Sequence, residues 1–231
     1  MTHRPTIQAI AFDAYGTLFD IYSIGALAEE LFPGSGAALA ELWRDRQIEY
    51  TRIRTLCGRY ADFWSVTGDA LDFACEKLRL PLTLTARDQL MGQYARITAF
   101  PETRPALTAL RQQAIPLAIL SNGTPDMLAS AVTAAGMEGF FDHILSVDRV
   151  RRFKTAPEAY QLGPDAFGCP TEEILFVSSN GWDVCGVTWF GYTTFWVNRT
   201  AGSLERLGVR PTAEGRSLND LVDFVSAKRA P

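Results

Sequence analysis

The chain has 231 residues, 47% of them hydrophobic, and 22 Lys and Arg against 26 Asp and Glu give a net charge of −4 at pH 7. This length and apolar content suit one soluble domain, or one domain with a sizeable insertion, and no internal repeat is visible. The mild negative charge, without runs of Lys or Arg, disfavours nucleic acid as a partner.

Histidines and cysteines exclude several kinds of catalytic site. The only two histidines, His3 and His143, are not placed for a Ser-His-Asp or Cys-His site or for a zinc site. No Cys-x-x-Cys pair occurs, so neither a zinc knuckle nor a redox motif is predicted. We expect reduced, mostly buried thiols at Cys57, Cys75, Cys169 and Cys185.

No segment predicts a membrane partner. The apolar runs are far shorter than the roughly 20 residues of a membrane span. Asp13 interrupts the first apolar run before the hydrophobic region of a signal peptide forms. We therefore expect a cytoplasmic protein.

The first predicted strand covers residues 7–12, and a long helical block follows it. Between residues 20 and 100 no strand is convincing, and apolar residues recur at helical steps, as in Leu39, Trp43, Tyr50, Ile53 and Cys57. Further helices are predicted over residues 62–78, 85–97 and 104–113. The block is too long for a crossover, so we interpret residues 20–97 as an inserted helical cap and residues 1–19 and 98–231 as the core domain.

Strands and helices alternate in the rest of the chain, which is typical of an α/β fold. The further predicted strands are residues 116–120, 143–147, 174–177 and 193–197, and the helices are residues 125–135, 156–167, 181–190 and 218–227. Near-continuous hydrophobicity indicates parallel strands buried on both faces. The sequence thus predicts a Rossmann-like parallel sheet flanked by helices, with an all-helical cap subdomain.

Polar residues follow four of these strands. Asp13 follows the first, Ser121 and Asn122 the second, and Lys154 comes a few residues after the third. The fourth is followed by the run SSNGWD, from Ser178 to Asp183. Ligand sites of open parallel sheets lie beyond the carboxyl ends of the strands, so these groups are expected to converge. Two carboxylates and a lysine are hard to explain by helix capping alone.

The same residues resemble the motifs of the haloacid dehalogenase superfamily. The run FDAYGTLFD, from Phe12 to Asp20, resembles its first motif, whose aspartate is a covalent nucleophile. Ser121 to Gly123 looks like the second motif, Lys154 like the lysine of the third, and Ser178 to Asp183 like the last. The resemblance spans most of the chain and includes the cap.

Two departures from the superfamily's phosphatases favour the branch of the L-2-haloacid dehalogenases. Tyr15 stands where the phosphatases have a second Asp that serves as general acid. The last motif offers a single carboxylate, Asp183, beside Ser178 and Asn180, which makes a poor magnesium site. We therefore expect neither a metal nor another cofactor.

A cap segment adds to this resemblance. The run LWRDRQIEY, from Leu42 to Tyr50, resembles the dehalogenase cap helix whose arginine reaches into the active site. Arg44 and Ile48 lie four residues apart and therefore share a helix face, which pairs a positive charge with an apolar neighbour. Phe63 and Trp182 match family positions that complete an apolar wall.

The resemblance implies hydrolytic dehalogenation of short (S)-2-haloalkanoic acids, such as haloacetates and 2-halopropionates, to (R)-2-hydroxy acids through an ester on Asp13. The implied catalytic residues are Asp13, Thr17, Arg44, Ser121, Asn122, Lys154, Tyr160, Ser178, Asn180 and Asp183. The implied substrate-binding residues are Ala14, Tyr15, Arg44, Ile48, Phe63, Ser121, Asn122 and Trp182. It further implies a homodimer, with the cap helices at the interface.

Within this mechanism Arg44 and Asn122 are implied to stabilise the departing halide, and Ser121 to anchor the substrate carboxylate. Lys154 is expected to keep Asp13 and Asp183 ionised. Asp183 and Asn180 are candidates for activating the hydrolytic water, with Ser178 supporting Lys154 and Asp13.

Each candidate also has a plain structural interpretation. Asp13 can be a turn residue, Arg44 a partner of Glu41 or Asp45, and Ser178 or Asn180 a helix cap. Phe63 and Trp182 can be core aromatics. Three alternative functions stay open: a Mg²⁺-dependent phosphatase, a hydrolase of another small carboxylate electrophile, and a catalytically silent binding protein.

Overall fold

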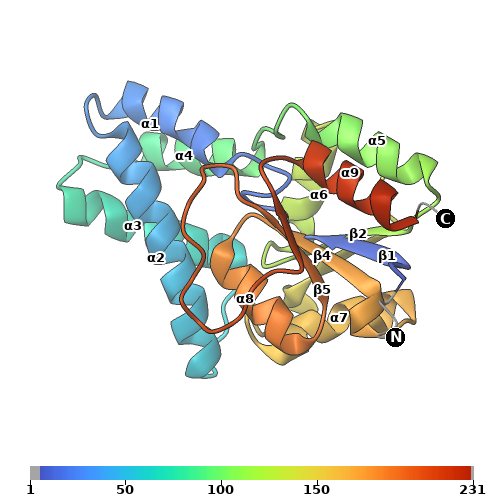
Figure 1. Ribbon diagram of the computed structural model, residues 1–231. Coiled ribbons are helices and arrows are strands. Elements are labelled where there is room, and N and C mark those ends of the chain that lie inside the picture. Colours follow the sequence, from blue (N-terminus) through green and yellow to red (C-terminus); the bar gives the residue numbers. More distant parts are fainter. Residues whose placement is uncertain (1–5, 230–231) are drawn as a thin grey trace.

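A computed structural model describes residues 6–229, in which six strands form one parallel sheet in the order β3-β2-β1-β4-β5-β6 (Figure 1). His3 lies outside the described residues. The strands are β1 (Ala9–Phe12), β2 (Leu117–Ser121), β3 (His143–Ser146), β4 (Ile174–Ser178), β5 (Thr193–Val197) and β6 (Ala213–Gly215). The predicted parallel α/β sheet is confirmed.

The strand β1 lies at the centre of the sheet. Its residue Ile10 pairs with Leu117 of β2 on one side and with Leu175 of β4 on the other, and all of β1 is buried. The chain winds outward through β2 and β3 on one side and through β4, β5 and β6 on the other. The carboxyl ends of β1 and β4 therefore flank the point where strand order reverses, the usual ligand site of such sheets.

Helices cover both faces of the sheet (Figure 1). On one face lie α5 (Thr103–Gln112), α6 (Pro125–Ala134) and α9 (Leu218–Arg229), and on the other lie α7 (Pro157–Phe167) and α8 (Gly181–Phe190). Short 3-10 turns, η2 (Val147–Arg149) and η3 (Thr171–Glu173), follow β3 and precede β4. The helix α6 begins at Pro125 because the Thr124 hydroxyl accepts a hydrogen bond from the N–H of Met127 and caps the helix. Proline is favoured at the first helical position, since it has no N–H to satisfy.

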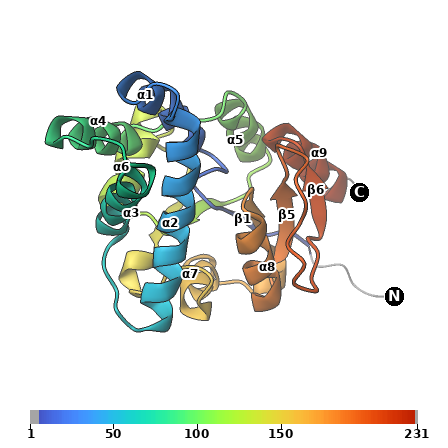
Figure 2. The ribbon, with the colours of Figure 1, turned by 90° about the vertical axis from the view of Figure 1, so that its left-hand side faces the viewer.

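Between β1 and α5 the chain forms a separate group of helices, beyond the carboxyl ends of the strands (Figure 2). They are the 3-10 turn η1 (Ile21–Ser23) and the helices α1 (Ile24–Leu31), α2 (Gly36–Leu56), α3 (Phe63–Leu78) and α4 (Leu84–Ala95). The long helix α2 packs against both α1 and α3. We call residues 20–97 the cap; the exact division of the chain into cap and core stays a prediction.

The two connections between cap and core are joined to each other. Asp20 N donates to Thr98 O at 2.8 Å, and Phe100 N donates to Leu18 O at 3.0 Å. Arg199, from the segment after β5, spans both connections: its Nη2 donates to Thr17 O at 2.8 Å, and its guanidinium carbon lies 3.6 Å from the centre of the Phe100 ring. A core side chain thus ties the cap connections to the residues that follow β1.

Some sequence predictions of elements are wrong in detail. The first strand begins at Ala9 rather than at residue 7, although Ile7 is buried. The short strand β6 was not predicted, because three residues with a central Glu214 carry no apolar run. The helix α1 was not predicted as a separate helix within the helical block of residues 20–97. Boundaries of the other elements differ by one or two residues at most, apart from α2, whose ends were not predicted.

The apolar series predicted on α2 is buried only in its first half. Leu39 and Trp43 are buried, whereas Ile53 is 49% exposed and Cys57 lies on the surface. In the last turns of α2 only one face is covered: Thr55 contacts the core segment of Phe153, whereas Leu56 is 86% exposed. The expectation of mostly buried thiols is therefore wrong for Cys57 and for the partly exposed Cys169, and correct for Cys75 and Cys185; all four are unpaired.

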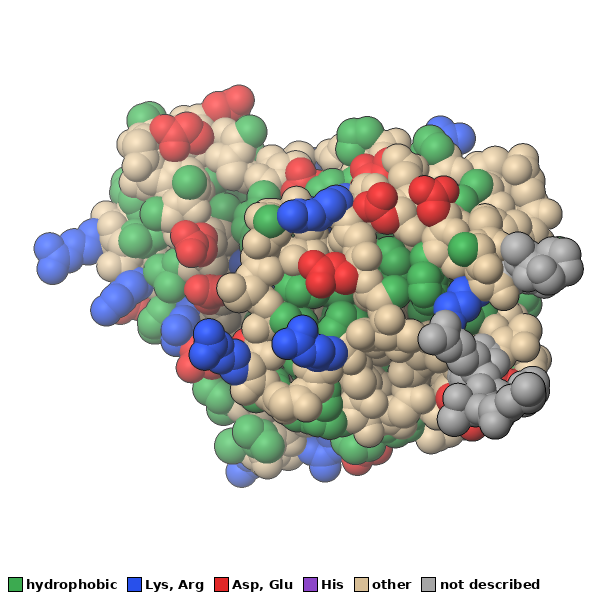
Figure 3. Space-filling model, viewed as in Figure 1, with side chains coloured by type: hydrophobic (Ala, Val, Ile, Leu, Met, Phe, Trp, Pro, Cys, Tyr) green, Lys and Arg blue, Asp and Glu red, His purple; other side chains and the backbone are tan. Residues whose placement is uncertain are grey.

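Helix hydrophobicity and surface charge bear on the expected lack of membrane and polyanion partners. No helix among residues 6–229 is long and apolar enough to cross a membrane. On the face shown in Figure 3, acidic and basic side chains are interspersed rather than gathered into a basic patch. This distribution agrees with the mild net charge of the sequence.

Two glycines of the cap give a prediction for stability. A Cβ on Gly36 would lie 2.6 Å from the backbone nitrogen of Glu29, whereas a Cβ on Gly25 would meet only Ala40 Cβ, at 3.9 Å. We expect Gly36→Ala to lower the free energy of unfolding by about 1–3 kcal/mol through overpacking. Gly25→Ala, in the helix α1, is expected to raise it by up to about 1 kcal/mol. Denaturant unfolding of both variants checks this, and equal stabilities would contradict the close α1–α2 approach.

Candidate active site

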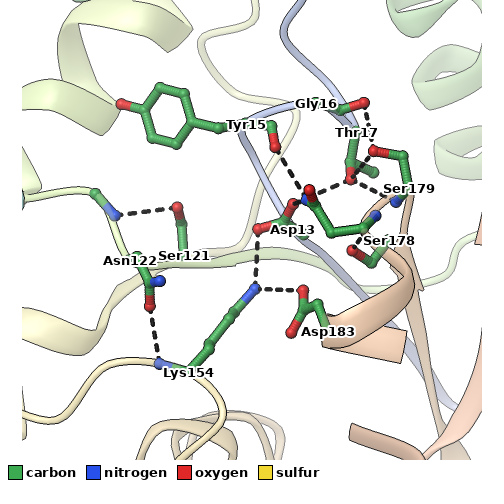
Figure 4. Close-up of polar contacts among 12 residues, drawn as sticks. Asp13, Tyr15, Gly16, Thr17, Ser121, Asn122, Lys154, Ser178, Ser179 and Asp183 are labelled. Carbon is green, nitrogen blue, oxygen red and sulfur yellow. Dashed lines mark hydrogen bonds and ion pairs between the residues drawn. The ribbon is translucent and has the colours of Figure 1, made fainter. Parts of the chain in front are cut away.

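Three charged side chains from distant parts of the sequence meet at the carboxyl edge of the sheet (Figure 4). Asp13 follows β1, Lys154 lies between η2 and α7, and Asp183 is in the first turn of α8. Lys154 Nζ lies 2.9 Å from Asp13 Oδ1 and 3.0 Å from Asp183 Oδ2. The ammonium therefore bridges the two carboxylates.

The whole Lys154 side chain is buried, and its ammonium lies 4.8 Å from the centre of the Phe176 ring. Burial opposes the charge, but the nearby carboxylates of Asp13 and Asp183 outweigh it and hold the pKa of Lys154 above its ordinary value. The lysine is therefore a fixed positive charge at neutral pH.

Asp183 is fully buried, and both of its carboxylate oxygens accept hydrogen bonds. Oδ2 faces Lys154, and Oδ1 accepts from Tyr160 Oη at 2.7 Å. Burial raises the pKa of Asp183 above its ordinary value, and the attraction of Lys154 counteracts part of this shift. Tyr160 thus lies against Asp183, and within residues 6–229 it forms no hydrogen bond with Asp13.

The second oxygen of Asp13 is held by two side chains. Asn180 Nδ2 donates to Asp13 Oδ2 at 2.8 Å, and Thr17 Oγ1 donates to it at 3.1 Å. In the described part of the chain the carboxylate accepts no backbone N–H, contrary to the interpretation of Asp13 as a turn or capping residue. Its two oxygens are instead held by the side chains of Lys154, Asn180 and Thr17.

Asn180 and its neighbours fix this arrangement. Asn180 is the N-cap residue of α8, yet its side chain makes no capping bond and reaches Asp13 and the carbonyl of Tyr15 instead. Ser178 Oγ accepts the N–H of Asn180 at 3.1 Å, and no bond from Ser178 to Lys154 or Asp13 is present in residues 6–229. Ser178 therefore supports Asp13 only indirectly, through Asn180, and the expected support of Lys154 by Ser178 is not formed.

Arg44 descends from α2 of the cap toward the site. Its Nη2 lies 3.4 Å from Tyr15 O and 3.5 Å from Asn180 Oδ1, both of which are long contacts. Its Nη1 donates to Gln47 Oε1 at 2.7 Å. The interpretation of Arg44 as an ion-pair partner of Glu41 or Asp45 is wrong, because its guanidinium contacts Gln47 of the cap and Tyr15 and Asn180 of the core instead.

Ser121 and Asn122 end β2 with donors that remain available. Ser121 Oγ accepts the N–H of Gly123 at 3.2 Å, and Asn122 Oδ1 accepts the N–H of Lys154 at 2.9 Å (Figure 4). The bond to Lys154 N fixes the orientation of the Asn122 amide: its oxygen faces the Lys154 backbone, and its Nδ2 points away from that backbone. No bond of Asn122 Nδ2 or of the Ser121 hydroxyl hydrogen to another described residue is formed.

Apolar side chains border these polar groups. The Tyr15 ring extends away from Asp13 and lies 5.8 Å from the Phe63 ring and 5.5 Å from the Tyr94 ring, between centres (Figure 4). Phe63 is fully buried, and Ile48 is 9% exposed. Trp182 is partly exposed, with the Arg52 guanidinium over its ring, so it lies at the rim. Ala14 is buried beneath the turn after β1.

Sequence reasoning missed two residues that support this site. Ser179 N donates to Thr17 Oγ1 at 2.8 Å, and Ser179 Oγ donates to Gly16 O at 2.6 Å, so Ser179 connects the turns after β1 and β4. Gln47 holds Arg44. Gln47 lies three residues after Arg44 on one helix face, and this spacing is a signal that was available in the sequence.

A cavity of about 370 Å³ lies next to the site, on the side of Arg199; Gly16, Ser179 and Asn180 are part of its wall, and Asp13, Lys154 and Asp183 are not. Asp13 itself is 5% exposed, behind Asn180. Within residues 6–229 no group of three or more His, Cys, Asp or Glu side chains is placed to hold a metal ion.

A buried aspartate between a lysine and hydrogen-bond donors, on this fold, defines a class of hydrolases. Residues 7–187 match the haloacid dehalogenase-like hydrolase family, and the chain belongs to this family.

Similar proteins agree with this assignment. Haloacetate dehalogenase H-2 of Moraxella sp. (strain B) is 45% identical over 205 residues, which is 89% of this chain and 92% of that protein. The crystal structure of the L-2-haloacid dehalogenase RSc1362 is 59% identical, with a TM-score of 0.94 over 96% of this chain and 99% of that one. A structure of L-2-haloacid dehalogenase from Xanthobacter autotrophicus with chloropropionic acid covalently bound is 36% identical, with a TM-score of 0.90 and coverage of 96% and 99%.

The Tyr160–Asp183 contact predicts a shift in titration. Tyr160→Phe removes a donor from the ionised carboxylate, so the pKa of Asp183 should rise further above its ordinary value. NMR titration of the aspartate carboxyl carbons measures this, with the Asp183 signal assigned from Asp183→Asn. The control Tyr192→Phe removes a hydroxyl that donates to Tyr160 O and should leave the pKa of Asp183 in place. An unchanged or lower pKa of Asp183 in Tyr160→Phe would contradict the hydrogen bond from Tyr160 to the ionised Asp183.

Proposed function

We propose that the protein hydrolyses short (S)-2-haloalkanoic acids, such as haloacetates and 2-halopropionates, to 2-hydroxy acids through an ester on Asp13. The observation that carries this proposal is the Asp13 carboxylate, which is 2.9 Å from Lys154 Nζ and receives hydrogen bonds only from side chains within the described chain. The similar haloacid dehalogenases, one of which holds covalently bound chloropropionic acid, support the same reaction.

In the first step a lone pair of Asp13 attacks the α-carbon of the substrate from the side opposite the halogen. The carbon–halogen bond breaks, the halide leaves with its electron pair, and the configuration inverts. A carboxylate is ionised at neutral pH and needs no general base for this attack. Lys154 and Asn180 keep the carboxylate oriented.

The departing halide gathers negative charge, which preorganised donors stabilise. Arg44 and the free Nδ2 of Asn122 approach from the cap and from the end of β2, with Phe63 as the apolar flank. The Ser121 hydroxyl and neighbouring backbone N–H groups take the substrate carboxylate. Arg44 and Lys154 balance Asp13 and Asp183, so the site is neutral before an anionic substrate enters.

In the second step water attacks the carbonyl carbon of the ester. The bond between that carbon and the bridging ester oxygen, which came from Asp13, breaks; the (R)-2-hydroxy acid leaves with this oxygen, and Asp13 regains its carboxylate with one oxygen from water. Asn180 is proposed to orient the water and Asp183 to take its proton, which then passes to the departing oxygen.

A magnesium-dependent phosphatase is not favoured. Both oxygens of Asp183 already accept hydrogen bonds, from Lys154 and Tyr160, and Tyr15 replaces the general acid that phosphoryl transfer needs. The remaining polar groups form a poor site for a divalent ion.

We expect halide release from 2-chloropropionate to be unchanged by an excess of EDTA. A loss of activity in EDTA that Mg²⁺ reverses would contradict metal independence.

The role of Asp13 gives the main test. Asp13→Asn should lower halide release from (S)-2-chloropropionate by at least about a thousandfold, because an amide is not a nucleophile toward saturated carbon. Asp20→Asn, a matched change outside the site, should retain activity. Acid quenching of the wild-type reaction, followed by mass spectrometry, should find the ester on the peptide containing Asp13. Undiminished activity of Asp13→Asn would refute the mechanism.

We also propose that the protein is a cytoplasmic homodimer that associates through the cap. Two apolar side chains of the last turn of α2, Ile53 at 49% and Leu56 at 86% exposed, support an interface at this part of the cap. Unpaired thiols at all four cysteines fit a reducing compartment. Sedimentation equilibrium should give twice the chain mass, and a monomer at micromolar concentration would contradict this proposal.

A further inference from the structure

Behind Arg44, buried polar side chains from three cap helices form a hydrogen-bonded network. Gln47 of α2, Thr67 of α3 and Tyr94 of α4 are 1%, 0% and 4% exposed. In Figure 2, α3 and α4 lie to the left of α2, and α3 packs against both α2 and α4. Gln47 Oε1 accepts from Arg44 Nη1 at 2.7 Å, so the network ends on Arg44.

A backbone carbonyl sets the direction of this network. Thr67 Oγ1 donates its single hydrogen to Phe63 O at 2.6 Å, because a carbonyl can only accept. Thr67 Oγ1 must then accept from Gln47 Nε2, which lies 2.6 Å away. The amide nitrogen of Gln47 therefore faces α3, and its oxygen faces Arg44.

Two aromatic residues hold the network in place. Tyr94 Oη lies 3.0 Å from Gln47 Nε2 and 3.1 Å from Gln47 Oε1, and burial raises the pKa of Tyr94, so the phenol stays protonated. Trp43 Nε1 donates to Thr67 O at 2.8 Å, which ties α2 to α3 next to Arg44. Both ends of the Gln47 amide are therefore held by hydrogen bonds.

Arg44 has one short bond on the cap side and only long contacts on the core side. Its distances to Tyr15 O and Asn180 Oδ1, 3.4 Å and 3.5 Å, are much longer than the 2.7 Å to Gln47. A flexible arginine side chain needs such a fixed acceptor to hold its planar guanidinium in one orientation. A donor that is oriented in advance stabilises developing charge best.

We propose that Gln47, held by Thr67, is a positioning residue that fixes the Arg44 guanidinium where the halide leaves. This inference rests on the proposed function, since it takes Arg44 as the donor to the departing halide. Chloride is a poorer leaving group than bromide, and its departure depends more on such a donor. A loosened Arg44 therefore slows dechlorination more than debromination.

Halide release in a single turnover, with enzyme in excess, tests this. The rates for (S)-2-bromopropionate and (S)-2-chloropropionate are measured with wild type, Thr67→Val and Gln47→Met. Thr67→Val keeps the shape of the side chain and removes the hydroxyl, and Gln47→Met removes the acceptor. In both variants the bromide-to-chloride rate ratio should rise by roughly three- to tenfold, the range expected for a slightly misplaced group.

Two controls separate positioning from packing. Thr67→Ser keeps the hydroxyl and should restore the wild-type ratio. Thr51→Val removes another buried cap hydroxyl, which donates to Ile48 O at 2.7 Å, and should leave the ratio unchanged.

The outcomes distinguish this inference from the proposed function. An unchanged ratio in folded Thr67→Val or Gln47→Met, or an equal shift in Thr51→Val, overturns the positioning role. If Thr67→Val does not fold, Gln47→Met decides alone. Wild-type protein that releases neither halide would instead refute the proposed function, and the inference with it.

Discussion

The ion-pair bridge from Lys154 to Asp13 and Asp183 is the interaction on which the rest of the site depends. One ammonium lies within about 3 Å of both carboxylates, and all three side chains are buried. Removing one partner of a buried pair leaves an uncompensated charge, at a cost of about 3–5 kcal/mol. The bridge therefore joins the turn after β1, the segment before α7 and the start of α8 as one unit.

The cap closes over this unit and touches the segment that carries Lys154. Thr55, near the end of α2, accepts Phe153 N at 3.1 Å through Oγ1 and Arg152 Nη1 at 2.8 Å through its carbonyl. Tyr60 Oη donates to Asp148 Oδ1 at 2.5 Å. Because Asp13 is almost fully buried in this arrangement, substrate entry requires some of these contacts to part. Closure then excludes water while the carboxylate reacts with carbon.

Most of the fold and the outline of the site were readable from the sequence. The runs of β1, β2, β4 and β5 are apolar because both of their faces are buried, and this makes them visible without a structure. Asp13, Lys154 and Asp183 were predictable as a group because parallel strands end at one edge. β6 was not, since a polar strand of three residues at the edge carries no such pattern.

The sequence did not predict which site residues contact one another. Tyr160 contacts Asp183 rather than Asp13, and Ser178 acts only through Asn180, because these contacts depend on the relative placement of α7, α8 and β4. The network of Gln47, Thr67 and Tyr94 requires three helices to pack, and polar residues inside a helix are ordinarily expected on its solvated face.

The most direct test of the central claim, attack by Asp13 on carbon, is a single turnover in water enriched in the heavy oxygen isotope, with enzyme in excess. The account predicts a 2-hydroxy acid that carries ordinary oxygen at its α-carbon, taken from Asp13, and heavy oxygen in the carboxylate of Asp13. Heavy oxygen at the α-carbon of the first-turnover product, with none in the peptide containing Asp13, would show that water attacks the substrate directly and would contradict the account.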